Sequence, residues 1–206
     1  MNPSSTLWPL VRSALAEPDE APAAPSPAPV TADAELRERL LAVHGLAVLN
    51  AAWRLLRHRK EAIDVAENVF RSALRRVAAT NGSAVAGAAL ETSAVKAAIE
   101  KIRAESAAPD KDCSRLLPAF DSSGHFARPV QPWAGAVTAA LKGSASHERL
   151  WAALEQLPLQ YRGVLALRDF ERAETREVAA VLGVSEETVK RRLNSARLAL
   201  LTLLGT

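Results

Sequence analysis

Apolar residues recur every three or four positions through much of this chain, which is the spacing of amphipathic α-helices. The pattern runs over residues 34–56, 61–78 and about 87–106. Turn formers and prolines separate or follow these segments, and no strand-like alternation competes with them. We therefore expect a three-helix domain over residues 34–106.

A second group of helical patterns fills the C-terminal part of the chain. It comprises residues 150–157, 161–170 and 178–182, followed by a long helix that begins at Ser185. Together the two groups predict an all-α fold made of two small helical domains. The apolar residues of 147–206 supply one contiguous candidate core, so we expect this four-helix domain to fold without the rest of the chain.

Helix breakers mark the other segments. Residues 17–32 hold five prolines among Ala, Glu and Ser, so residues 1–33 are expected to form a flexible extension and linker. Apolar residues within 7–15 are consistent with either a frayed terminus or a short docking peptide. Residues 107–146 contain many Pro and Gly residues, which predicts a flexible inter-domain tether with a short helix near 134–141.

Composition narrows the class of protein. The 206 residues are 49% hydrophobic and 24% charged, as in soluble globular chains, and the net charge of +3 suits a polyanionic partner without proving one. A single cysteine, Cys113, cannot form an internal disulfide, which favours a reducing compartment. The start of the chain lacks a signal-peptide pattern and no long apolar run occurs, so we expect a cytoplasmic protein without a membrane span.

The stretch from Thr175 onward has the punctuation of a helix-turn-helix motif. Thr175 can cap a short helix, Gly183 and Val184 can make a tight turn, and Ser185 can cap the next helix. Acidic residues directly after Ser185 suit the positive end of that helix. The sequence therefore predicts two helices joined by a short turn, and the second of them is long.

The last helix has two distinct faces. At about 100° per residue its apolar residues form one stripe, and a polar arc with several cations lies opposite. Arg191 and Asn194, with Thr188, occupy positions that can reach base edges in a major groove, whereas Lys190 and Arg197 suit phosphates. A merely solvated helix face is the alternative, but the caps and the turn favour DNA binding. The candidate DNA-binding residues are Ser185, Glu187, Thr188, Lys190, Arg191, Asn194 and Arg197.

A family resemblance becomes visible in these motifs. Residues 154–168 read LEQLPLQYRGVLALR, 177–185 read EVAAVLGVS and 188–197 read TVKRRLNSAR. They resemble the C-terminal domain of extracytoplasmic-function sigma factors, which in that family recognises the upstream, minus-thirty-five promoter element. The resemblance covers about 147–204 without a gap.

A weaker resemblance lies upstream. Residues 61–71, EAIDVAENVFR, are similar to the polymerase-binding helix of the family, and 96–103 are similar to the end of its minus-ten-reading helix. Several positions depart from the family pattern, and residues 80–106 contain no Trp, Tyr or Phe to stack on unpaired bases. The resemblance therefore implies a diverged N-terminal domain. The polymerase-binding residues that it implies are Asp64, Glu67, Asn68, Phe70 and Arg71.

Catalysis and metal binding find little support in the sequence. Cys113, His125 and His147 are too few and too scattered for a zinc site. Asp121 and Ser122 lie near His125 but without a nucleophile elbow, and neither Gly-rich phosphate motif occurs. We expect no catalytic activity, no metal and no cofactor.

The resemblance implies a sigma-factor-like transcription initiation protein whose partners are RNA polymerase core and double-stranded promoter DNA. An inhibitory anti-sigma protein is a further partner that the resemblance leaves open. One alternative is a diverged DNA-binding regulator that no longer forms a productive holoenzyme. Another is an interaction protein, such as a decoy, that holds partners without reading DNA; the well-furnished polar arc argues against it.

Overall fold

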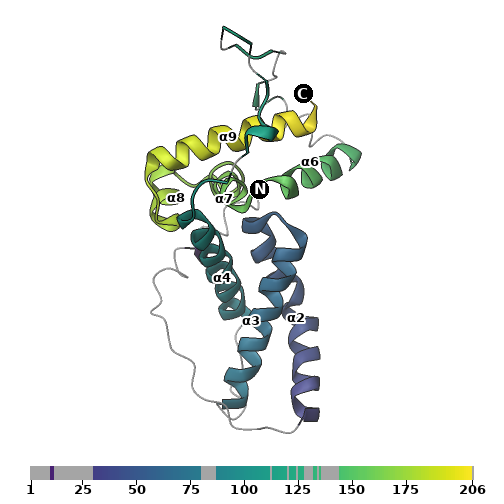
Figure 1. The fold of residues 1–206 in the computed structure, drawn as a ribbon. Helices are drawn as coiled ribbons and strands as arrows, with labels where there is room; N and C mark the ends of the chain where they lie inside the picture. Colours follow the sequence, from purple (N-terminus) through teal and green to yellow (C-terminus); the bar gives the residue numbers. More distant parts are fainter. Residues whose placement is uncertain are drawn as a thin grey trace. The chain divides into compact units, whose positions relative to one another are not determined.

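The computed structural model describes residues 10–11, 30–79, 87–111, 113–119, 121–123, 125–127, 132–133, 135 and 144–205. In this part of the chain every regular element is helical and no β-strand occurs, which confirms the all-α prediction. The helices are α2 (Val30–Leu56), α3 (Arg59–Ala79), α4 (Gly87–Ala107), α6 (Ser144–Gln156), α7 (Leu159–Leu165), α8 (Thr175–Leu182) and α9 (Glu186–Leu204), with the short turns η2 (Ser114–Leu116) and η3 (Ala166–Phe170) (Figure 1). The predictions for 7–15 and 134–141 lie almost entirely outside the described residues.

The chain divides into two compact units, Met1–Lys101 and Ile102–Thr206. The division falls inside α4, so this helix contributes most of its length to the first unit and its last turns to the second. Each unit has its own set of buried apolar side chains.

In the first unit α2 and α3 form an antiparallel helical hairpin (Figure 1). Two residues, Arg57 and His58, connect them, and Arg57 has a positive φ of 49°. The imidazole Nδ1 of His58 accepts a hydrogen bond from the backbone N–H of Glu61 at 3.3 Å, which satisfies one of the free donors at the start of α3. The chain therefore reverses direction within a single short connection.

The first part of α4 packs in the same unit. Gly87 begins the helix where a Cβ atom would lie 2.6 Å from the His44 ring, so a larger residue at this position would force the His44 side chain to shift. Further along, Lys101 lies 4.0 Å from the carboxylate of Glu61 on α3. The apolar sides of the three helices meet in a common core that includes Val48, Leu55, Leu56, Val69, Phe70, Leu90, Val95 and Ile99.

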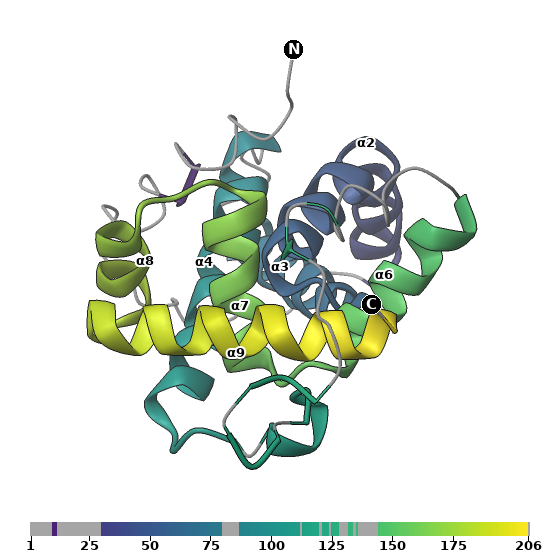
Figure 2. The same ribbon diagram turned by 90° about the horizontal axis from the view of Figure 1, so that it is seen from above.

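The second unit is built around α9. This helix packs on α6, α7 and α8 (Figure 1), and Figure 2 shows that it crosses α7. At its C-terminal end the Arg149 side chain on α6 donates a hydrogen bond to the carbonyl of Leu204 at 3.0 Å. The largest fully buried side chains of this core include Leu150, Leu154, Leu157, Leu165, Leu167, Leu182 and Leu200. The C-terminus of the chain thus forms the four-helix arrangement that the periodicity predicts.

Residues directly after the unit boundary are integral to this second unit. A Cβ atom at Gly163 of α7 would lie 2.5 Å from Cγ2 of Ile102, which places the end of α4 in close contact with α7. The Arg103 side chain donates two hydrogen bonds, of 3.0 and 2.7 Å, to the carbonyl of Val181 at the end of α8. A domain that begins at residue 147 would lack these contacts.

We predict that a fragment of residues 102–206 unfolds cooperatively and at a higher temperature than a fragment of residues 147–206. The shorter fragment loses the Ile102 and Arg103 contacts and also leaves the buried guanidinium of Arg192 without its carboxylate partner. Breaking one side of a buried ion pair costs ~3–5 kcal/mol. Thermal melting followed by circular dichroism measures the difference, and equal melting temperatures would contradict this account.

Candidate nucleic-acid interface

The helix-turn-helix motif begins with the start of α8. Its N-cap is Glu174, whose backbone N–H donates a 2.9 Å hydrogen bond to the carboxylate of Glu177. The expectation that Thr175 caps this helix is wrong by one position, because Thr175 is already the first helical residue while Glu174 has an extended backbone (φ −70°, ψ 151°). The carboxylate of Glu177, at the third helical position, thus accepts from the free backbone N–H of Glu174.

The turn and the second cap agree with the prediction. Gly183 ends α8 in the left-handed conformation (φ 67°, ψ 35°), which glycine adopts at low cost. The backbone N–H of Val184 then donates to the carbonyl of Ala179 at 3.1 Å, and this closes the turn. Ser185 caps α9 with its hydroxyl oxygen, which accepts from the backbone N–H of Thr188 at 3.1 Å. Together these local interactions fix the direction in which α9 leaves the turn.

One side of α9 is buried and the other is exposed. Val189, Ala196 and Leu200 are fully buried, and Leu193 is 8% exposed. The polar residues opposite them form what we call the reading arc, whose members are Glu187, Thr188, Lys190, Arg191, Asn194 and Arg197. Thr188 and Arg197 are half-buried and the other four are exposed. Contact between this arc and DNA stays a prediction.

Two arginines of α9 share one carboxylate. Arg192 is only 3% exposed, and its Nε and Nη2 atoms donate to Oδ1 of Asp110 at 2.9 and 2.6 Å. The same Nη2 donates to the carbonyl of Ser106 at 3.0 Å. Arg191 is exposed, and its Nη2 donates to the other carboxylate oxygen, Oδ2 of Asp110, at 2.9 Å. The segment after α4 is thereby joined to the second helix of the motif.

The charge of Asp110 is well stabilised. Burial raises the pKa of this carboxyl group, but the hydrogen bonds and positive charges of Arg192 and Arg191 outweigh burial, and the resulting pKa lies below its ordinary value. Asp110 is therefore a carboxylate at neutral pH. The sequence alone does not identify Asp110 as a site residue, because nothing in a local pattern shows which distant side chain will meet a buried arginine.

Arg197 is held in a second ion pair. Its Nε and Nη2 donate to the two carboxylate oxygens of Asp169 at 2.8 and 2.6 Å, a bidentate geometry. Asp169 lies in η3, where the helix widens and the N–H of Glu171 donates to the carbonyl of Ala166 at 2.9 Å. The Arg197 guanidinium also lies 5.7 Å from the ring centroid of Trp133, within cation–π range. This arginine, for which a phosphate contact is expected, is engaged within the protein.

The rest of the reading arc is open. Within the described residues, Glu187, Lys190 and Asn194 are exposed and form no hydrogen bond or ion pair with another side chain. Glu187 also lies in the first turn of α9, where its charge complements the helix dipole. Lys190 and Asn194 are consequently the members of the arc that a nucleic acid could contact without displacing a protein group.

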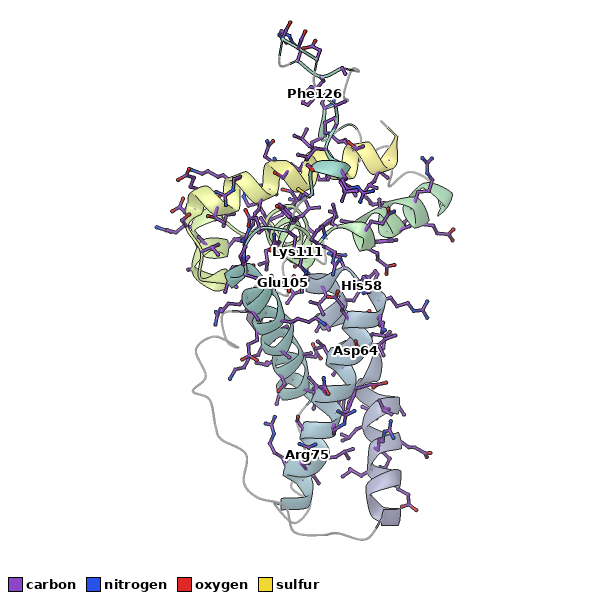
Figure 3. The ribbon with its side chains drawn as sticks, viewed as in Figure 1. His58, Asp64, Arg75, Glu105, Lys111 and Phe126 are labelled. Atoms are coloured by element: carbon purple, nitrogen blue, oxygen red, sulfur yellow. The ribbon has the colours of Figure 1, made fainter. Side chains whose placement is uncertain are left out.

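The expected polymerase-binding residues divide into two sets. Asp64, Glu67, Asn68 and Arg71 are exposed on α3, where Figure 3 labels Asp64. The Arg71 side chain donates to Oδ1 of Asn68 at 2.9 Å. Phe70 is 4% exposed and belongs to the core of the first unit. All five residues therefore lie on α3; four of their side chains are exposed and that of Phe70 is buried.

Other kinds of site are not formed by the described residues. No group of three or more His, Cys, Asp or Glu side chains among them is arranged to hold a metal ion. Within the same residues, no helix combines the length and apolarity needed to cross a membrane. The reading arc is thus the surface whose shape and chemistry point to a ligand.

Comparison with known proteins assigns the part of the chain that carries this arc. Residues 147–200 match the family described as Sigma-70, region 4, a helix-turn-helix DNA-binding domain rather than a catalytic one. The match ends before the last turn of α9 and does not reach residues 1–146. No curated protein matches the chain. The C-terminal match supports a sigma-70 type of protein with a sigma-factor-like DNA-binding role.

Tyr161 anchors the segment that carries Asp110. Its hydroxyl donates to the carbonyl of Lys111 at 3.0 Å, and Lys111 also forms an ion pair with Glu105 (Figure 3). Burial, followed by interactions with Cys113 and Asp110, raises the pKa of Tyr161 to about 12. The neutral phenol is thus favoured by the folded protein.

Alkaline titration should show this shift directly, because Tyr161 is the one tyrosine of the chain. We expect its absorbance change near pH 12 in the folded protein and at its ordinary pKa of 10.0 in denaturant. Since the folded-state pKa is raised, the associated stability is fully present below pH 10.0 and is lost as the pH rises through about 12. A folded-state midpoint equal to that in denaturant would show that Tyr161 does not hold the segment.

Proposed function

We propose that this chain is a sigma-factor-like transcription initiation protein of the extracytoplasmic-function type, which binds RNA polymerase core in the cytoplasm and directs it to promoter DNA. One observation carries the proposal: a capped helix-turn-helix, within the stretch that matches Sigma-70 region 4, presents an exposed polar arc with cations on its second helix. The polymerase supplies the catalysis, and this chain needs no metal or cofactor.

The N-terminal half of α9 is the part that enters the major groove in this proposal. A groove of B-DNA admits one α-helix, and the first turns of a recognition helix meet the base edges. Asn194 can pair with adenine and Arg191 with guanine, in each case through two hydrogen bonds. Lys190 lies beside them and suits a phosphate. Ser185, Glu187, Thr188 and Arg197 border this contact.

The exposed side of α3 is the proposed contact for the polymerase. Asp64 and Glu67 offer carboxylates to cations of a partner helix, and Asn68 and Arg71 extend the same polar surface. Exposed ion pairs of this kind contribute little each, so the surface depends on several contacts acting together. Phe70 supports this helix from the core rather than touching the partner. An inhibitory anti-sigma protein is a further partner that the family resemblance leaves open.

A diverged DNA-binding regulator is the second candidate function. Its specific support is the lack of Trp, Tyr and Phe in residues 80–106, where the sigma-factor resemblance leads one to expect aromatic residues that stack on unpaired bases. Such a protein would keep the reader on α9 without forming a productive holoenzyme. Transcription with purified core polymerase separates the two functions.

Substitutions of Arg191 and Lys190 in the reading arc should have different effects on DNA binding. We expect Arg191→Ala to cost about 1–3 kcal/mol on the preferred DNA site and to relax base preference, because a base-edge contact is lost. Lys190→Ala should weaken binding to all sequences alike and reduce the salt dependence by about one counterion. Titrations of labelled duplexes at several salt concentrations measure both effects. If neither substitution changes affinity for any duplex, the arc is not the DNA-binding surface.

We expect this chain to differ in its two proposed activities, polymerase binding and promoter opening. We predict that the chain co-purifies with core polymerase but opens promoters weakly, because each stacked base would contribute ~1–3 kcal/mol and the aromatic side chains are missing. Permanganate footprinting on a mapped promoter measures opening. Failure to bind core would favour the stand-alone regulator, and strong opening without other factors would show that stacking is supplied elsewhere in the chain.

A further inference from the structure

The tether, residues 107–146, touches the reading arc at two separated points. Asp110 bonds to Arg191 near the N-terminal end of α9, and Trp133 lies over the guanidinium of Arg197 two turns further on. The short turn η2, which belongs to the tether, also contacts α9. The side of α9 that carries the DNA-binding candidates is therefore partly covered by the protein's own chain.

The two oxygens of Asp110 have different surroundings. Oδ1 receives two hydrogen bonds from the buried Arg192. This arrangement fixes the carboxylate in place, so that Oδ2 can meet the exposed Arg191 at 2.9 Å with little further loss of freedom. Among the described residues Arg191 has no other partner. The positive charge of Arg191 is thus neutralised by the Asp110 carboxylate, which is already held in place by Arg192.

A carboxylate is a close chemical substitute for the groups that DNA presents to arginine. Carboxylate and phosphate oxygens both accept short, charge-assisted hydrogen bonds from a guanidinium, and a guanine edge accepts from the same donors. Arg197 is engaged still more fully, because its Nε and Nη2 donate to Asp169 and its guanidinium lies over the ring of Trp133. Neither arginine can give its full set of donors to DNA while these contacts persist.

We propose that the tether is an internal competitor for DNA at the reading arc, in which Asp110 occupies Arg191 and Trp133 covers Arg197. This inference rests on the proposed DNA-binding function of α9. DNA must displace the outer half of the Asp110 contact, while the inner half, to Arg192, stays in place. The opposite arrangement, in which Asp110 positions Arg191 for DNA, predicts the opposite sign in the test below.

Asp110→Asn in the full-length chain is the direct test. Exposed ion pairs are worth about 0.2–1 kcal/mol, so removing the competing charge should tighten binding to a selected duplex by up to about fivefold. Asp121→Asn is the matched control, because it removes the same charge from the tether at a carboxylate whose partners among the described residues are backbone N–H groups and His125.

A double substitution shows whether the effect passes through Arg191. In an Arg191→Ala background, Asp110→Asn should no longer tighten binding. Unchanged or weaker binding by Asp110→Asn protein that still melts cooperatively above the assay temperature overturns the proposal in favour of a positioning or purely structural carboxylate. A gain that persists in the Arg191→Ala background overturns it as well.

Trp133→Ala provides a second route if Asp110→Asn does not fold. Trp133 is half-exposed on the tether, and its removal should tighten DNA binding by uncovering Arg197. Unchanged affinity of this variant then contradicts the proposal.

Failure of the proposed DNA-binding function would look different from failure of the competitor proposal. If α9 does not bind DNA, then wild type, Arg191→Ala and Lys190→Ala bind every duplex equally. If only the competitor proposal fails, Arg191→Ala and Lys190→Ala still lose affinity for DNA.

Discussion

The second unit depends on the way in which the buried positive charge of Arg192 is paired. Arg192 projects from α9 into a position that is only 3% exposed, and a guanidinium there is stable only with a carboxylate partner and further hydrogen bonds. Asp110 and the carbonyl of Ser106 provide them, which draws the end of α4 and the first residues of the tether against α9. Two further contacts hold the end of α4 in this unit: Ile102 lies against Gly163 of α7, and Arg103 donates to the carbonyl of Val181 on α8.

This constraint divides the basic residues of α9 into three groups. Arg192 holds the domain together, Arg191 and Arg197 are exposed or half-exposed but paired within the protein, and Lys190 is open. A count of charges along the helix treats these residues as equivalent. Their surroundings differ, so the cations that DNA can engage most readily are those that are open or held only by an exposed ion pair.

Much of the fold could be predicted from the sequence because it follows from local physics. The spacing of apolar residues predicted the helices, and Gly183 and Ser185 predicted the turn and the cap that the structure contains. The cap of α8 was missed by one residue, because Glu174 and Glu177 satisfy the helix end in place of a short hydroxyl side chain.

The ion pairs of the site could not be predicted in this way, because they join residues far apart in the sequence. Arg192 did give one signal: on a helical projection it lies only about 60° from the centre of the buried stripe, near enough to be drawn into the core. The partner of such a residue is set by tertiary packing. The role of Phe70 had the same difficulty, since a family motif does not show which of its residues face the interior of this chain.

The central claim, that the N-terminal half of α9 reads DNA, is tested most directly by a chemical probe on that helix. Cys113 is buried, so a cysteine introduced at Asn194 gives an accessible thiol for an iron chelate that cleaves nearby DNA. The account predicts focused cleavage around the major groove of a selected site from position 194. A thiol at exposed Thr202, near the other end of α9, should give none. Cleavage from position 202 without cleavage from 194 would contradict the account.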